Sequence, residues 1–269
     1  VPLRQQHDVD HPAHSLGSED TWAGRAQLRF AFGLRSELLV SGDYSRSRGT
    51  PLNLARPLAA KPDAQLPFDV PADFWSVRTS HLADGRSDRG GAAARLSVQV
   101  ADSLTLTSLT AYRNSDLHIF VNSDTTEHEV ATPRVPDKQR QVPQELTLTG
   151  RTARFTWISG LAWFDERGGG GLDLALYQAG SQFRGLSTID TSAWAVFGQA
   201  GFRLLERISL TGGVRYSDQQ QEAAINNGMY LLGTSTPLPR TRPSSFVVGT
   251  SDEHAASNAT RSAFFMLLY

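Results

Sequence analysis

Residues 194–218 read WAVFGQAGFRLLERISLTGGVRYSD, and two kinds of side chain alternate on both sides of a short charged break. Apolar residues or glycine occupy every second position, from Trp194 to Leu204 before the break and from Ile208 to Tyr216 after it. The positions between them include the polar residues Gln199, Arg203, Ser209, Thr211, Arg215 and Ser217. A period of two is typical of β-strands, and the short break predicts that two strands form a hairpin with one apolar and one polar face.

The same pattern occurs three more times earlier in the chain. Its paired segments are residues 21–32 with 37–45, 95–100 with 104–112, and 146–149 with 155–163. The sequence therefore predicts an all-β fold of about eight antiparallel strands in four hairpins. Each strand holds roughly 9–13 residues, which is the length that a tilted strand needs to cross a bilayer.

The predicted connections differ at the two ends of the hairpins. Turns within a hairpin are short, whereas the links between hairpins are long and polar, at about residues 47–88, 115–140 and 167–191 and after residue 218. The glycine tract Gly168–Gly171 is expected to form a flexible loop. Short turns at one end and long loops at the other are typical of transmembrane β-barrels of the outer membrane.

Aromatic residues mark both ends of the predicted strands. Six that favour a membrane interface fall at the long-loop ends, namely Trp22, Tyr44, Tyr112, Trp163, Trp194 and Tyr216, and a second group lies toward the short turns. These six are predicted to be membrane-interface aromatics in contact with outer-membrane lipid. Aromatic side chains also anchor the rims of soluble barrels, and the asymmetry of the loops favours the membrane.

Composition excludes several classes of function. The 26 basic residues nearly balance the 27 acidic ones, so the chain has no net field that would attract a nucleic acid. The absence of cysteine excludes disulfides and thiolate chemistry. The first residues, VPLRQQHDVDHPAH, lack the features of a signal peptide, so we expect that one has been removed or that the chain is an internal piece of a longer product.

Few residues are candidates for chemistry. His7, His11 and His14 lie among Asp8 and Asp10, but Pro12 and the terminal position favour a polar loop over a metal site. No phosphate-loop, nucleophile-elbow or zinc-protease motif occurs. Ser159 lies on the predicted outer face, where no histidine or carboxylate could activate it, which argues against a lipid-modifying enzyme. We therefore expect no catalytic residue, metal site or cofactor.

The predicted inner face is charged. It carries Arg25, Arg29, Arg95, Arg113, Arg203 and Arg215 together with Glu37, Asp43 and Glu145. Such a face suits a wet lumen, in which charged side chains pair across the interior or line a wide channel.

Six phrases in order resemble the barrel of a TonB-dependent outer-membrane receptor. They are GSEDTWAGRAQLRF, LLVSGDYSRSRGTP, LTLTSLTAYRNSD, QVPQELTLTGR, WISGLAWFDE and AVFGQAGFRLLERISLTGGVRYSD. The resemblance implies a larger barrel of about 22 strands around a plug domain, which imports a scarce nutrient such as a ferric siderophore, cobalamin or a saccharide with energy from the TonB complex. This sequence shows neither a plug nor a TonB-contacting box, so it resembles an internal piece of such a receptor.

The leading interpretation is therefore a partial outer-membrane β-barrel domain over residues 1–269. Residues 1–19 are expected to form a polar lead-in, and residues 219–269 a long loop followed by a segment without a clear pattern. The partners are outer-membrane lipid and an extracellular small-molecule ligand, with the plug and the TonB complex implied by the resemblance alone. A small complete barrel for adhesion or structural anchoring, and a lipid-modifying barrel enzyme, remain alternatives. Ligand-contacting loop residues follow no general code, so no substrate-binding residue is predicted.

Overall fold

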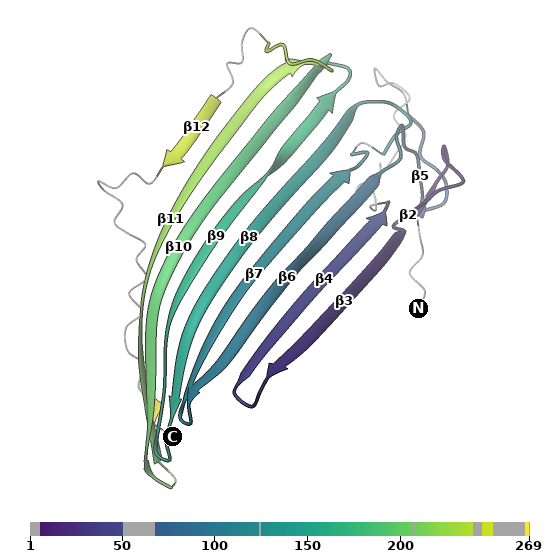
Figure 1. Ribbon diagram of the computed structural model, residues 1–269. Coiled ribbons are helices and arrows are strands. Elements are labelled where there is room, and N and C mark those ends of the chain that lie inside the picture. Colours follow the sequence, from purple (N-terminus) through teal and green to yellow (C-terminus); the bar gives the residue numbers. More distant parts are fainter. Residues whose placement is uncertain are drawn as a thin grey trace.

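The computed structural model describes residues 6–50, 68–123, 125–206, 208–238, 244–249 and 267–268. Its main element is one antiparallel sheet in which sequence neighbours lie side by side, in the order β12-β11-β10-β9-β8-β7-β6-β4-β3, with β13 beside part of β11 (Figure 1). Among the described residues no helix is long and apolar enough to span a membrane. The all-β, antiparallel fold predicted from the alternating pattern is confirmed.

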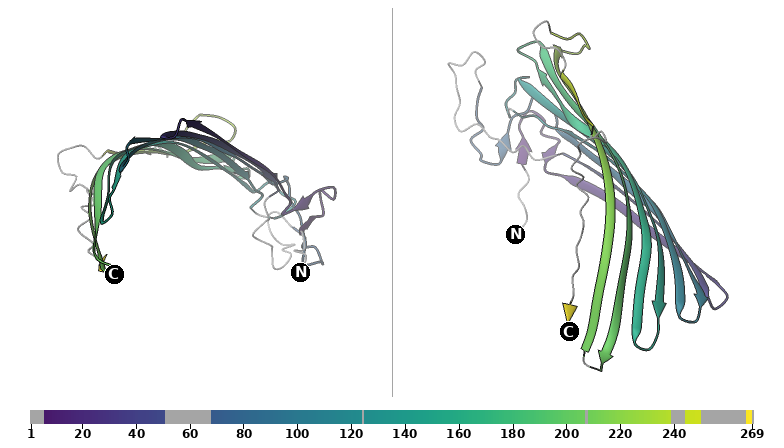
Figure 2. Two further views of the ribbon diagram at one scale, coloured as in Figure 1. Left: turned by 60° about the horizontal axis from the view of Figure 1, so that its bottom comes forward. Right: turned by 90° about the vertical axis from the view of Figure 1, so that its left-hand side faces the viewer.

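Eight long strands make up most of the sheet. They are β3 (Glu19–Phe32), β4 (Ser36–Gly49), β6 (Asp84–Ala101), β7 (Leu104–Phe120), β8 (Ala131–Arg151), β9 (Phe155–Leu176), β10 (Ser181–Leu205) and β11 (Ile208–Leu231). The short strands β12 (Ser244–Gly249) and β13 (Leu267–Leu268) both pair with β11. The sheet bends into an open arch, which the end-on view of Figure 2 shows.

The register places the predicted apolar positions on one face. Trp194, Val196, Gly198, Ala200 and Phe202 of β10 lie opposite Trp163, Leu161, Ser159, Trp157 and Phe155 of β9. The same agreement holds for the other strand pairs, where Leu28 lies opposite Val40 and Leu106 opposite Leu148. Because successive side chains of a strand point to opposite faces, a register shift of one residue in any strand pair would move apolar side chains to the polar face.

The large sheet has almost no buried core. Large apolar side chains on its apolar face are exposed, including Leu28 at 60% and Val214 at 61%. Of the described apolar residues that are buried, Ala195 lies in this sheet, whereas Leu16, Val77 and Ala83 form a cluster elsewhere. A sheet with an exposed apolar face is stable only where an apolar medium covers that face. Lipid fulfils this condition for a membrane barrel.

The strands are longer than predicted, and this corrects several expectations. Gly168–Gly171, predicted to be a flexible loop, lies inside β9, and residues 219–231, predicted to be a loop, continue β11. The predicted long link at 167–191 is wrong, because only residues 177–180 separate β9 from β10. Beyond the membrane both faces of a strand meet water, so the apolar alternation stops while the hydrogen-bonded pairing continues.

The N-terminal segment is not wholly a loop. Strand β1 (Gln6–Asp8) pairs antiparallel with β2 (Ser15–Leu16) and parallel with β5 (Ser76–Val77). This small sheet carries the cluster of Leu16, Val77 and Ala83 and joins the main sheet through Gly17 N, which donates to Thr50 O at 2.7 Å. In the predicted long link at about residues 47–88, Pro71 is described, while the prolines at 51, 57, 62 and 67 lie outside the described residues, as do residues 239–243 and 250–266.

Candidate functional site

The aromatic residues at the long-loop ends shift in one direction along the sheet. Of the five steps between successive aromatics, one involves no shift, because Trp163 pairs directly with Trp194. In each of the other four steps, the aromatic lies two residues nearer the short turns than the residue in the same row as the preceding aromatic. Tyr44, for example, lies opposite Gly24 rather than Trp22, and Tyr216 opposite Val196 rather than Trp194. All four shifts have the same direction, as expected when tilted strands cross one horizontal plane.

With the six aromatics taken to lie in one plane, the size of the shifts gives the tilt of the strands. The four steps amount to about 26 Å along the strands, over a lateral distance of about 34 Å for the seven spacings from β3 to β11. The resulting tilt of about 38° lies within the range of transmembrane barrels, roughly 35–45°. Two pairs of these rings also touch, with centroids 5.9 Å apart for Trp22 and Tyr44 and 5.5 Å apart for Trp194 and Tyr216.

The polar face carries an ion pair that spans an intervening strand. Arg113 of β7 donates two hydrogen bonds to the carboxylate of Asp43 in β4, at 3.1 and 3.0 Å. Strand β6 lies between them, and its residue in this row is Gly91. A Cβ on Gly91 would lie only 2.6 Å from the Tyr112 carbonyl oxygen and 3.0 Å from Cγ of Arg113, so the missing side chain leaves the path over β6 open.

Further polar contacts line the same face. Arg25 lies directly opposite Asp43, and Arg29 binds Glu37 at 2.5 Å. Glu166 of β9 accepts hydrogen bonds from Gln139 at 2.8 Å and Gln141 at 3.1 Å, both in β8. These groups are exposed or partly exposed, so each pair contributes little to folding. Together they make a wall that presents fixed charges and amides to water.

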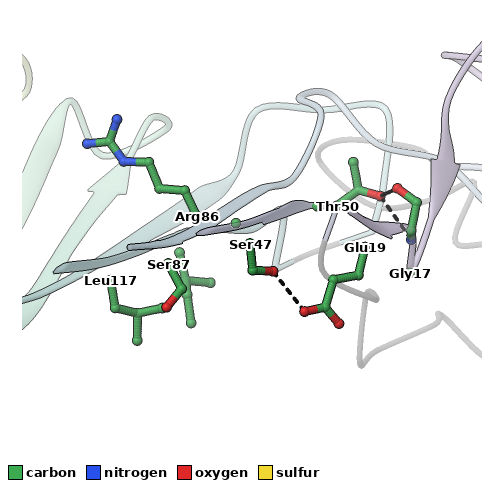
Figure 3. A pocket seen from close by; sticks show the side chains of 11 residues that line it. Gly17, Glu19, Ser47, Thr50, Arg86, Ser87 and Leu117 are labelled. Carbon is green, nitrogen blue, oxygen red and sulfur yellow. Dashed lines mark hydrogen bonds between the residues drawn. The ribbon is translucent and has the colours of Figure 1, made fainter. Parts of the chain in front are cut away.

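A pocket of about 360 Å³ lies at the long-loop end of this wall (Figure 3). Glu19 accepts hydrogen bonds there from Ser47 Oγ at 2.7 Å and Thr21 Oγ1 at 3.1 Å, and these bonds hold the pKa of Glu19 below its usual range. Leu117 and Ser87 line the pocket beside Ser47. The pocket therefore combines an ionised carboxylate, hydroxyl groups and an apolar patch.

The histidine-rich segment has a structural arrangement. Asp8 is buried, accepts a hydrogen bond from Thr79 and pairs with His11 Nδ1 at 2.9 Å, while Arg78 binds Asp10 at 2.9 Å. His7 and His14 do not join this cluster, and the described residues contain no group of three or more His, Asp or Glu placed to hold a metal. Ser159 lies between Leu148 and Gly198 on the apolar face.

Comparison with known proteins identifies the family of this chain. The family model of the TonB dependent receptor-like β-barrel matches residues 21–249. The chain belongs to this family. TonB-dependent receptors are transporters of the bacterial outer membrane, and the chain is located there.

Two solved receptors share the fold of this TonB-dependent receptor barrel. The ferric yersiniabactin uptake receptor FyuA from Yersinia pestis matches 91% of the chain with a TM-score of 0.65 and 15% identity. The ferric-catecholate import receptor Fiu from E. coli K12 matches 97% with a TM-score of 0.55 and 12% identity. The chain spans only 36% and 45% of these two receptors, respectively. The comparison with curated proteins found no match.

Sequence reasoning placed Asp43 and Arg113 on the inner face but missed their contact and the pocket at Glu19. The pocket could have been predicted by extending the alternation beyond the apolar segments, because Glu19, Ser47 and Ser87 all occupy the alternate positions that lie on the polar face. Glu166 is found in the same way. The contact between β4 and β7 requires the three-dimensional reach of Arg113 across Gly91.

Proposed function

We propose that this chain forms part of the wall of an outer-membrane receptor that takes up a bulky, scarce nutrient such as a ferric siderophore. The observation that carries the proposal is the polar face, whose charges line the side away from lipid and whose upper end has the Glu19 pocket. The receptors FyuA and Fiu, which share the fold, are named for uptake of ferric yersiniabactin and ferric catecholates. In this proposal the chain binds and passes its ligand without bond chemistry.

The wall requires further strands and partners. Within the described residues β3 pairs only with β4, so its other edge leaves backbone groups unpaired over 14 residues. Such an edge is unfavourable in a membrane, where every backbone group needs a partner. We therefore propose that strands outside this chain close a larger barrel of about 22 strands around a plug domain, and that the TonB complex supplies the energy.

The six aromatics are proposed to lie at the outer membrane interface. The common direction of their shifts and the resulting tilt of about 38° support this position. Their exposure, between 42% for Tyr44 and 63% for Trp22, leaves the rings accessible to headgroups.

Uptake by the complete receptor tests the proposed function. The receptor is expressed in an iron-limited bacterium that lacks its own siderophore receptors, and uptake of radioactive iron is measured with a panel of ferric siderophores. We expect energy-dependent uptake of at least one of them, abolished by an uncoupler or by loss of TonB. Surface attachment without uptake of any siderophore would instead support the adhesion alternative.

A further inference from the structure

The carboxylate of the Glu19 pocket has one oxygen atom that is open to a ligand. Ser47 Oγ at 2.7 Å and Thr21 Oγ1 at 3.1 Å both donate to Oε1 of Glu19. Within the described residues, no hydrogen bond or ion pair is made by the other oxygen, Oε2. Two hydroxyl groups thus hold the carboxylate in place, and Oε2 remains available for a charge-assisted hydrogen bond from a ligand.

The basic residues nearest in sequence and register lie on the other face of the sheet. Arg48 and Arg86 are directly opposite each other on β4 and β6, and Figure 3 shows Arg86 pointing away from the side on which Glu19 and Leu117 lie. On the polar face, Asp137 of β8 lies directly opposite Leu117 and adds a second carboxylate. Among the described residues neither Glu19 nor Asp137 forms an ion pair, so this end of the polar face is negative.

Two glycines form a floor without side chains beside the carboxylate. Glu19, Gly49, Gly85 and Ile119 occupy one row across β3, β4, β6 and β7, and three strand spacings of about 4.8 Å separate the ends of this row by about 14 Å. A Cβ on Gly49 would clash with the carbonyl oxygen of Ser18, so this position excludes any side chain. The row is therefore a trough that runs from a carboxylate to an apolar side chain.

The open oxygen and the trough fit a primary ammonium group on a short alkyl chain. An ammonium is a compact point charge that one oxygen can accept, whereas a guanidinium binds best through two parallel bonds, which need both oxygens. A divalent cation requires more oxygen ligands than one carboxylate offers, and the described residues hold no group of metal ligands. The methylene groups beside the ammonium can lie over the glycines and contact Leu117 and Ile119, which are both half-buried.

We infer that the Glu19 pocket binds an aminoalkyl arm of the ligand, with the ammonium group on Oε2 of Glu19 and the methylene groups directed toward Ile119. The inference rests on the proposed function, because it treats the polar face as the side that meets the ligand. It narrows the cargo to a nutrient complex that carries a free primary amine. The volume of about 360 Å³ accommodates such an arm, while the bulk of the cargo lies beside the wall.

Saturation-transfer NMR titrations of the complete purified receptor with two soluble probes test the inference. N-acetylcadaverine carries one ammonium group at neutral pH, and N,N′-diacetylcadaverine is its neutral counterpart. The charged probe should bind about fivefold more tightly, which is the upper range for an exposed ion pair, and Glu19→Gln should remove this difference. Asp20→Asn is the matched control, because Asp20 is the next residue of β3, is also exposed and lies on the opposite face, so the difference should remain.

Three results would overturn the inference. They are equal or undetectable binding of the two probes to the wild-type receptor, an undiminished difference in Glu19→Gln, and loss of the difference in Asp20→Asn. Heat-modifiable electrophoretic migration verifies folding of each variant. If Glu19→Gln fails to fold, added salt must reduce the difference in the wild-type receptor, because salt screens an exposed ion pair, and a difference independent of salt would count against the inference.

The probe titration and the uptake experiment separate the two proposals. A difference between the probes that depends on Glu19, without uptake of any ferric siderophore, would overturn the proposed function and leave the ammonium site standing. Uptake of a siderophore by a receptor that does not distinguish the probes would overturn the ammonium site alone.

Discussion

Replacing Leu28 with arginine tests whether the apolar face meets lipid. Leu28 is 60% exposed and lies opposite Val40, and its neighbour Gln27 points to the polar face opposite Ser41. The two positions are adjacent on one strand and have nearly the same depth. Leu28→Arg and Gln27→Arg therefore form a matched pair that differs in the face of the sheet.

The depth of Leu28 sets the size of the effect. Trp22 and Phe32 are ten residues apart, or about 33 Å along β3 and about 26 Å along the membrane normal at a tilt of about 38°. Leu28, six residues from Trp22, lies about 16 Å deep and thus within about 3 Å of the midplane. An arginine at the midplane of a barrel costs about 2–4 kcal/mol. We expect a loss of about 3 kcal/mol for Leu28→Arg, a factor of roughly 150 in the folding equilibrium, and little change for Gln27→Arg.

Urea titration of the complete receptor in phospholipid vesicles measures both variants, with tryptophan fluorescence as the signal. Equal losses of stability at the two positions would refute the assignment of the faces. A larger loss for Gln27→Arg would reverse it.

Three further experiments test particular contacts. Gly91→Ala should destabilise the barrel by about 1–3 kcal/mol because its Cβ would approach the Tyr112 carbonyl oxygen, whereas Gly212→Ala, with no atom within 4 Å of its Cβ, should be neutral in the same urea titration. Asp43→Asn and Arg113→Gln, whose side chains are 38% and 54% exposed, should show a coupling of at most about 1 kcal/mol in a double-mutant cycle, and a larger coupling would contradict this exposed pairing. The lowered pKa of Glu19 stabilises the folded state above the ordinary glutamate value of 4.5, and this contribution is lost as pH falls through the lower folded-state pKa. Glu19→Gln should therefore weaken that acid dependence of amide protection around Glu19 and Ser47, measured by hydrogen exchange, and an unchanged profile would show that Glu19 is not its source.

The sequence predicted the eight long strands and their faces because a half-buried strand repeats with a period of two. The alternation from Trp194 to Tyr216 fixes which side chains share a face, and the hydrogen-bonded register agrees with it. The short turns followed for the same reason, since the break between two alternating segments locates the turn. Family resemblance added the number of strands expected in the complete barrel, which no local pattern contains.

The features that the sequence did not predict lie where no alternation of apolar and polar residues occurs. Gly168–Gly171 has no apolar alternation because both faces of β9 are wet at this height, yet its backbone still pairs with β8 and β10. The pairing of His7 with Ser76 in the small sheet joins segments far apart in sequence, with no periodic signal in either. The facing positions of Arg140 and Arg167 likewise depend on register, because these residues come together only when β8 and β9 pair as they do.

The shift of the aromatic residues along the sheet also implies a dimension for the proposed barrel. Continued around 22 strands, a spacing of about 4.8 Å and a tilt of about 38° give a circumference of about 134 Å and a pore about 43 Å in diameter between backbones. Side chains such as Arg113 reach only a small part of that width, so they cannot seal the pore. In the proposed barrel, the offset between Trp22 and Tyr216 would therefore set the width of the pore, and the proposed plug would be needed to close it.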